Sequence, residues 1–302
     1  MTTSLKRLVA RALTALLAVA APACAAEETP HPPAEKWTFS GPFGRFDRAQ
    51  LQRGFQVYRE VCSSCHALKY IYFRNLAQPG GPEFSEAQVK ALAAEYKVQD
   101  GPNDQGEMFE RPGRPADRIP WAFANEQAAA AANGGKAPPD LSVMAKARTY
   151  ERGFPWWLID IVTMYQEQGP NYITALLLGY EDPPQGFELP AGGNYNKYYP
   201  GHVIAMPNVL NDGQVSYPKG SDDQPVVPET KAQYARDITA FLQWAAEPHL
   251  EERKRLGFQS IVFLAVFAGL VWYMKKKIWA RVGGETEGVV AADVAAKTAA
   301  RH

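Results

Sequence analysis

Apolar residues recur at helical spacing in several stretches of the chain, and long proline- and glycine-rich connections separate these stretches. In the first of them, Leu51, Phe55 and Tyr58 fall on one face of a helix, the spacing expected when that face is buried. The same reasoning predicts five helices in the central part of the chain. They are residues 47–61, 85–97, 156–166, 172–178 and 230–246.

Side chains at the predicted helix starts support this assignment. Ser85 with Gln88 and Thr230 with Gln233 have the spacing of capping boxes, and Asp47 can cap the first helix, since such side chains accept hydrogen bonds from first-turn amides. No segment of useful length alternates apolar and polar residues, so strands are not predicted. The sequence therefore predicts a mainly α protein with long loops. Gly169-Pro170 is expected to separate the third and fourth helices.

Two further apolar segments lie near the ends of the chain. Residues 1–25 have a basic start, an apolar centre and the small-residue run Ala23-Cys24-Ala25, the pattern of a secretory signal peptide. A mitochondrial presequence or a lipid anchor on Cys24 would be the alternatives. Residues 256–274 carry no charge and are long enough, at about 28 Å, to cross a bilayer. The sequence predicts export of the domain formed by residues 26–255, held by one membrane helix.

Lysines 275–277 and Arg281 follow the predicted membrane helix directly. Basic residues beside a span favour the cytoplasmic side, so residues 275–302 are expected to form a cytoplasmic tail. Both ends together predict a single-pass protein of a bacterial inner membrane, with its large domain in the periplasm.

The charge of the whole chain balances to zero, but its distribution is uneven. Residues 26–255 hold 29 acidic and 23 basic side chains, a net charge of −6. Several of the acidic residues gather in one loop, where only Lys97 relieves them. They are Glu95, Asp100, Asp104, Glu107 and Glu110. This loop is either an ordinary solvated loop or a docking surface for a basic partner.

Cys62-Ser63-Ser64-Cys65-His66 is the strongest chemical signal in the sequence. C-x-x-C-H in an exported protein is typical of covalent haem attachment, with both cysteines bonded to the porphyrin and the histidine on the iron. A zinc half-site would need a second ligand pair, and a thioredoxin-like redox pair would need a βαβ context. Neither is present in the sequence. The mature chain would keep no other cysteine, so we expect no structural disulfide.

A sixth iron ligand would make the haem an electron carrier, and the candidates are the remaining histidines and methionines. His31, His249 and His302 lie in a proline-rich segment, beside the membrane helix and at the end of the chain. The methionines at 108, 144, 164 and 274 lie in the acidic loop, in helical patterns or in the anchor. Met206 instead precedes Pro207 in an irregular segment, where proline rigidifies the loop. Met206 is the favoured ligand and His202 its main rival.

These motifs resemble the cytochrome c1 family, the haem-bearing subunits of ubiquinol–cytochrome c oxidoreductases (cytochrome bc1 complexes). The resemblance covers almost the whole mature length and rests on several runs besides the haem motif. They are Arg111-Pro112-Gly113, residues 131–142 (AANGGKAPPDLS), residues 172–180 with Pro183-Pro184, residues 194–201 (NYNKYYPG), Ile204-Ala205-Met206-Pro207 and the C-terminal anchor.

The resemblance implies a class I cytochrome c-like haem domain with long loop insertions and one C-terminal transmembrane helix. It implies one haem c bonded to Cys62 and Cys65, with His66 and Met206 on the iron. It further implies cytochrome b as a membrane neighbour, a Rieske iron–sulfur protein as electron donor and a soluble cytochrome c as electron acceptor. Nucleic acid is not expected among the partners. The acidic loop would then meet the basic face of that cytochrome.

One departure from the family pattern concerns the haem propionates. An arginine that approaches a propionate in many members is replaced here by Ala130, and Arg114 or Arg118 would have to serve instead. The alternatives to the electron-carrier hypothesis are a free-standing membrane cytochrome or an oxidase subunit and, more remotely, a thiol–disulfide oxidoreductase.

Overall fold

The computed structural model describes residues 29–150, 153–163, 168–221 and 223–300. The predicted signal peptide with Cys24, the candidate ligand His302 and the helical-pattern residue Met164 lie outside the described residues. The chain divides into two units, residues 1–248 and residues 249–302.

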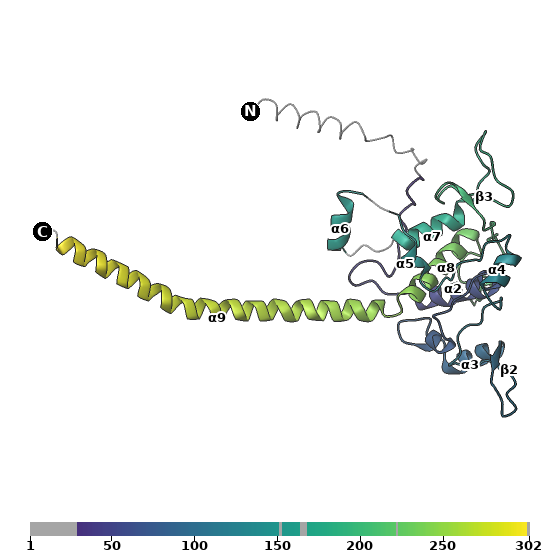
Figure 1. The fold of residues 1–302 in the computed structure, drawn as a ribbon, viewed down its shortest axis with the longest axis horizontal. Coiled ribbons are helices and arrows are strands. Elements are labelled where there is room, and N and C mark those ends of the chain that lie inside the picture. The colour runs from purple at the N-terminus through teal and green to yellow at the C-terminus, as the bar shows by residue number, and fades with distance from the viewer. Residues whose placement is uncertain (1–28, 151–152, 164–167, 222, 301–302) are drawn as a thin grey trace, which may run out of the picture. The chain divides into compact units, whose positions relative to one another are not determined.

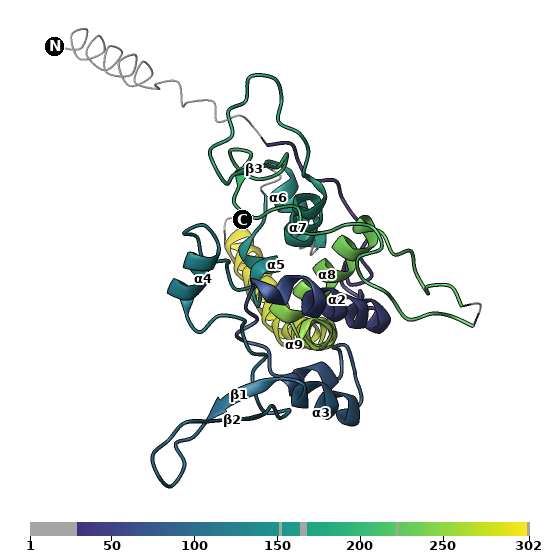
Figure 2. The same cartoon turned by 90° about the vertical axis from the view of Figure 1, so that its right-hand side faces the viewer.

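The first unit is built on a pair of helices that come from opposite ends of its sequence. α2 (Arg48–Glu60) packs against α8 (Lys231–Ala246), and both lie at the centre of the unit (Figures 1 and 2). Phe55 and Tyr58 of α2 contact Phe241 of α8, with ring centroids 5.6 and 6.1 Å apart. All three are buried. The apolar stripe predicted for the first helix therefore lies in the core, facing the buried side of α8.

Smaller helices surround this pair. α7 (Gln168–Leu178) and α5 (Met144–Ala147) pack on α8, and α3 (Glu86–Ala94) packs on the short 3-10 helix η2 (Phe73–Ala77). Two more helices lie among the described residues of this unit. They are α4 (Glu126–Ala132) and α6 (Trp156–Thr163). The structure thus confirms the mainly helical fold.

Two short hairpins lie in the long loops. β1 (Lys97–Asp100) pairs antiparallel with β2 (Phe109–Pro112), and β3 (Asn194–Tyr195) pairs with β4 (Val203–Ile204). Figure 2 shows the β1–β2 hairpin projecting away from α3. Strands of two to four residues are too short to give a recognisable alternation, which explains why the sequence did not predict them.

Three details differ from the predictions. Gly169 and Pro170 do not interrupt a helix; they lie in the first turn of α7, where a missing amide costs no helical hydrogen bond. The helix expected over 85–97 ends at Ala94, because Lys97 already belongs to β1. At Thr230 only half of the predicted capping box forms: Thr230 caps Gln233 N, but the Gln233 side chain donates to Asp237.

The second unit is one long helix, α9 (Leu250–Ala299). Residues 250–280 are long and apolar enough to cross a membrane, with a mean hydropathy of 1.8 in the best window. It is the one such helix among the described residues. The helix extends past the predicted span of 256–274 in both directions. The structure therefore supports a single candidate membrane span.

Candidate haem-binding site

The five residues of the C-x-x-C-H motif form one tight turn at the end of α2. The 3-10 helix η1 (Cys62–Ser64) follows α2 directly, and the amides of Cys65 and His66 both donate to the carbonyl of Cys62, at 3.1 and 2.9 Å. This turn brings the two sulfurs and the imidazole onto neighbouring positions of a single loop of backbone. That is the placement a porphyrin edge needs for two thioether bonds and an iron ligand.

A backbone carbonyl from a distant loop orients the His66 ring. His66 Nδ1 lies 2.7 Å from the carbonyl oxygen of Pro139, and a carbonyl can only accept, so Nδ1 carries the proton. Nε2 is then left with its lone pair for a metal. Burial is the main cause that lowers the pKa of His66, which favours the neutral form that iron requires. The donor set fits a haem iron.

The loop that supplies Pro139 is itself fixed to the haem motif. Asp140 accepts from the Lys69 amide at 2.8 Å and from the Ser142 amide at 2.9 Å. The buried Ser142 hydroxyl accepts from the Tyr70 amide at 3.0 Å, and the Leu141 amide donates to the Ala67 carbonyl. The run 139–142 therefore lies alongside residues 67–70 and holds the Pro139 carbonyl in place.

Two aromatic side chains complete the support of this turn. Trp121 Nε1 donates to the Cys65 carbonyl at 2.9 Å, and the Tyr58 hydroxyl donates to the His66 carbonyl at 3.2 Å. Sequence reasoning missed Pro139, Asp140, Trp121 and Tyr58 as supports, since a backbone carbonyl and a remote indole leave no spacing pattern. Only the run Pro138-Pro139-Asp140 gave a signal, because two prolines beside an Asp favour a rigid turn.

The alternative chemistries of the motif find little support. Burial raises the pKa of the Cys62 thiol to about 12, whereas a redox-active cysteine needs a lowered pKa to form its thiolate. Within the described ranges, no group of three or more His, Cys, Asp or Glu side chains could hold a metal ion. The raised pKa of the Cys62 thiol disfavours a thioredoxin-like pair.

Met206 lies in a different loop, just after the β3–β4 hairpin. The Tyr180 hydroxyl, two residues beyond the end of α7, donates to the Met206 carbonyl at 3.0 Å, and the Met206 side chain is half-buried. The Asn194 side chain also approaches the carbonyls of Ile204 and Ala205. Hydrogen bonds from two elements therefore fix the backbone that carries the thioether.

His202 occupies the turn of the same hairpin. It is buried, adopts φ +59°, and places Nδ1 3.2 Å from the Asn196 carbonyl. Its ring stacks on Tyr195 with centroids 5.4 Å apart. These contacts give His202 a structural role in the turn. Its Nε2 is not used by them, so His202 stays the rival of Met206.

The other candidates lie in varied surroundings. His31 packs against Tyr150, and His249 lies beside Glu252 at the start of α9. Met108 is exposed in the β1–β2 connection, and Met144 begins α5.

The residues considered for the haem propionates lie in three places. Arg118 donates to the Tyr72 hydroxyl at 3.1 Å, Arg114 is exposed, and Ala130 is half-buried in α4.

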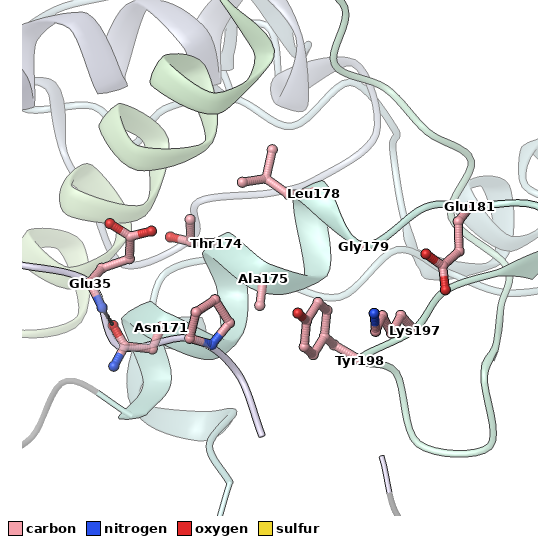
Figure 3. A pocket seen from close by; sticks show the side chains of 10 residues that line it. Glu35, Asn171, Thr174, Ala175, Leu178, Gly179, Glu181, Lys197 and Tyr198 are labelled. Carbon is pink, nitrogen blue, oxygen red and sulfur yellow. Dashed lines mark hydrogen bonds between the residues drawn. The ribbon is translucent and has the colours of Figure 1, made fainter. Parts of the chain in front are cut away.

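A cavity of about 230 Å³ lies between the N-terminal segment, α7 and the loop before β4. Figure 3 shows Glu35 and Asn171 at one end and Lys197 and Tyr198 at the other. The Asn171 side chain accepts from the amide of Glu35 at 3.1 Å. None of the predicted haem residues lines this cavity, so it is separate from the candidate site.

Comparison with known proteins agrees with this geometry. The sequence pattern described as "Cytochrome C1 family" matches residues 37–282. The chain belongs to the cytochrome c1 family. A protein named cytochrome b/c1 from Bradyrhizobium diazoefficiens is 61% identical over 255 residues, which are 84% of this chain and 36% of that protein. This chain therefore spans about a third of that relative's length.

Other relatives of the cytochrome c1 family match over most of their own length. Cytochrome c1 of Blastochloris viridis is 50% identical over 83% of this chain and 87% of its own. A mitochondrial relative from Arabidopsis thaliana, named cytochrome c1 1, heme protein, is 45% identical over 82% of this chain and 72% of its own. Membership of the cytochrome c1 family gives this chain a covalently bound c-type haem as its cofactor.

Proposed function

We propose that this chain is the membrane-anchored electron carrier of a quinol–cytochrome c reductase. It accepts one electron from a Rieske iron–sulfur protein and passes it to a soluble cytochrome c, in a complex that also contains cytochrome b. Membership of the cytochrome c1 family supports this assignment, as does the name cytochrome b/c1 of the Bradyrhizobium relative. The family match makes a free-standing cytochrome or an oxidase subunit the weaker alternative.

Cys62 and Cys65 would hold the haem through thioether bonds, and His66 and Met206 would be the axial ligands. The contact between His66 Nδ1 and the Pro139 carbonyl is the observation that carries this proposal, since it fixes the tautomer that binds iron. The bound haem supplies a one-electron Fe(III)/Fe(II) couple, and a thioether ligand raises its potential. The role of the protein is to hold both ligands and close the last coordination position.

In the proposed topology, residues 26–255 form the periplasmic haem domain, residues 256–274 cross the inner membrane and residues 275–302 lie in the cytoplasm. Lysines 275–277 directly after the apolar stretch support this orientation through the positive-inside rule. The signal-like pattern of residues 1–25 supports export of the large domain.

The acidic loop would be the landing surface for the soluble cytochrome. Three of its carboxylates are paired with cationic side chains, which reduces the negative charge that they offer to a partner protein. Glu95 lies 3.0 Å from Arg59, Glu110 lies 3.8 Å from Lys97, and Asp100 pairs with Arg111. Asp104 and Glu107 are exposed in the β1–β2 connection. We define these two residues as the hairpin tip and assign to it most of the attraction for a basic partner.

The decisive experiment replaces Met206 by Leu in the full-length protein and measures the visible spectrum and the reduction potential. If Met206 is the ligand, the covalent haem stays, the potential falls on the order of hundreds of millivolts, and the reduced protein binds carbon monoxide. Met108→Leu is the matched control, because Met108 is exposed in a hairpin connection, and it should change neither property.

His202→Asn tests the rival ligand. Asparagine tolerates the positive φ of His202, so the turn should survive the change. An unchanged potential in Met206→Leu together with a large fall in His202→Asn would assign the iron to His202.

The composition of the complex needs a separate test. A tagged wild-type chain should co-purify with a haem b protein and an iron–sulfur protein. Failure of these two proteins to co-purify from quinol-oxidising membranes would contradict the proposal.

A further inference from the structure

α6 presents large apolar side chains to solvent around the helix. Five large apolar side chains of α6, and that of the preceding Phe154, are each between 43% and 81% exposed. They are Phe154, Trp156, Trp157, Leu158, Ile159 and Ile161. One charged residue, Asp160, accepts a hydrogen bond from Gln168 at 3.0 Å. A helix that is apolar on all sides is normally buried, and such a patch on a soluble surface marks an interaction site.

The fold sets α6 apart from the core. Figure 1 shows it standing away from α5, α7 and α8. The two ends of its segment are nevertheless held together: Gly169 at the start of α7 packs so closely on α5 that a Cβ would overlap the Ala145 carbonyl and lie 2.9 Å from the Arg148 carbonyl. The chain therefore leaves the core at Arg148 and returns at Gly169, with α6 between.

The segment that carries α6 begins at the end of α5, close to the last residues of the first unit. Lys146 Nζ of α5 is 3.2 Å from Glu247 Oε2, and Glu247 is the C-cap of α8. Pro248 is the last residue of the first unit, and the candidate membrane span begins at Leu250. The segment that carries α6 therefore starts from the same corner of the domain from which the chain departs toward the span.

We propose that α6, together with Phe154, is a second membrane contact that inserts into the lipid interface beside the anchor. Eight residues give a helix of about 12 Å, too short to cross a bilayer of about 30 Å, so insertion must be shallow. Two adjacent tryptophans have the amphipathic rings that favour the headgroup level. No Lys or Arg lies within Trp156–Thr163, which favours apolar insertion over attraction to anionic lipid.

This inference rests on the membrane attachment in the proposed function but on none of its electron-transfer steps. The anchor keeps the domain at the bilayer, so the contact needs little affinity of its own. Its consequence is orientational: two attachment points restrict the rotation of the haem domain about a single helix.

A single introduced cysteine can test the contact. The full-length protein carrying Leu158→Cys is labelled with an environment-sensitive fluorophore and reconstituted in phosphatidylcholine vesicles, with and without a lipid that bears a nitroxide near its headgroup. Val226→Cys is the matched control, because Val226 is an exposed apolar residue on another loop. The expected result is a blue-shifted emission and about a twofold quenching at position 158, against no change at 226.

Other outcomes would overturn the proposal. Equal emission at the two positions would show that α6 stays in water. A blue shift at position 158 without quenching would show that protein, either another subunit or a second copy, covers the helix. Ile161→Cys gives a second reporter if Leu158→Cys loses its haem absorbance. Labelling of the mature protein, whose cysteines are Cys62 and Cys65, without an introduced cysteine would instead contradict the thioether bonds. This control separates a failure of the proposed function from a failure of this inference.

Discussion

Arg53 Nε lies 2.9 Å from Asp237 Oδ2, and this ion pair joins α2 to α8. Asp237 is fully buried and also accepts from the Tyr217 hydroxyl at 2.9 Å and from the Gln233 side chain at 2.8 Å. The carboxylate is thus fully hydrogen-bonded, as a buried charge must be. Burial, reinforced by Asp237, raises the pKa of Tyr217, so the phenol stays protonated and remains a donor.

Removal of this carboxylate should destabilise the domain strongly. Asp237→Ala leaves the part-buried Arg53 without its carboxylate partner, and breaking a buried pair typically costs about 3–5 kcal/mol. The measurement is chemical unfolding of the detergent-solubilised chain, followed by haem absorbance. Lys219→Ala is the control: its pair with Asp223 is exposed, and loss of such a pair should cost about 1 kcal/mol or less. Equal effects of the two changes would refute the importance of the buried pair.

The close approach of α2 to α8 depends on Gly54. A Cβ at this position would overlap the Asp237 carbonyl and lie 2.7 Å from Phe241 Cβ. Gly54→Ala should therefore lower the unfolding midpoint, although alanine favours an isolated helix by about 1 kcal/mol. Gly257→Ala in α9 meets no atom within 4 Å and should not lower it. A midpoint for Gly54→Ala at or above the wild-type value would contradict this packing.

The β1–β2 hairpin should loosen in acid. Arg111 donates to Asp117 at 2.6 and 2.9 Å and also pairs with Asp100. Its hydrogen bonds lower the pKa of both carboxyls. A lowered folded-state pKa gives stability that is present above the usual carboxyl value of about 4 and is lost as the pH falls through the lowered value.

Hydrogen exchange of the Val98 and Phe109 amides, which lie in the hydrogen-bonded pairs Val98–Arg111 and Asp100–Phe109 of the ladder, measures this effect at pH 5 and pH 3. Exchange, corrected for its intrinsic pH dependence, should speed up at pH 3 in the wild type. In Arg111→Gln the same amides should already exchange fast at pH 5. A wild-type hairpin with the same protection at both values would contradict the role of these pairs.

The hairpin tip should govern the salt dependence of electron transfer to a basic cytochrome c. Asp104→Asn with Glu107→Gln removes two exposed charges and should lower the second-order rate several-fold at low ionic strength. The difference should vanish at high salt, where the charges are screened. Glu181→Gln with Asp182→Asn removes two exposed charges from another loop and is the control. If both pairs of changes slow the reaction equally, net charge rather than the hairpin tip steers the partner.

The sequence predicts best those helices that have both a capping side chain at the start and an apolar stripe along one face. α2 has an Asp47 cap and a buried apolar stripe. α8 has a Thr230 cap and buried apolar residues such as Tyr234, Ile238 and Phe241, so propensity and tertiary packing agree in both helices. The turn at residues 62–66 is predictable from the motif because local backbone hydrogen bonds, from the amides of Cys65 and His66 to the Cys62 carbonyl, close it. The break expected at Gly169-Pro170 is wrong because a helix start and a helix end both tolerate these residues, and here they begin α7.

The supports of the site could not be predicted in the same way. His66 meets Pro139 across 73 residues, and Tyr180 reaches Met206 across 26. Such pairs depend on how loops fold over one another, which no periodicity records. The resemblance to the cytochrome c1 family identified the run 131–142 as specific, but the structure explains why: this run carries the carbonyl that orients the histidine.

The junction of Ala145 and Gly169 also sets what the fold tolerates in evolution. Because α5 and α7 fix both ends of the connection that carries α6, its length contributes only a loop-closure entropy, and doubling it would cost about 0.6 kcal/mol. Insertions and deletions in this stretch therefore leave the α2–α8 core and the haem turn untouched. The stretch between α5 and α7 is thus a peripheral module whose length and sequence can change independently of the redox centre.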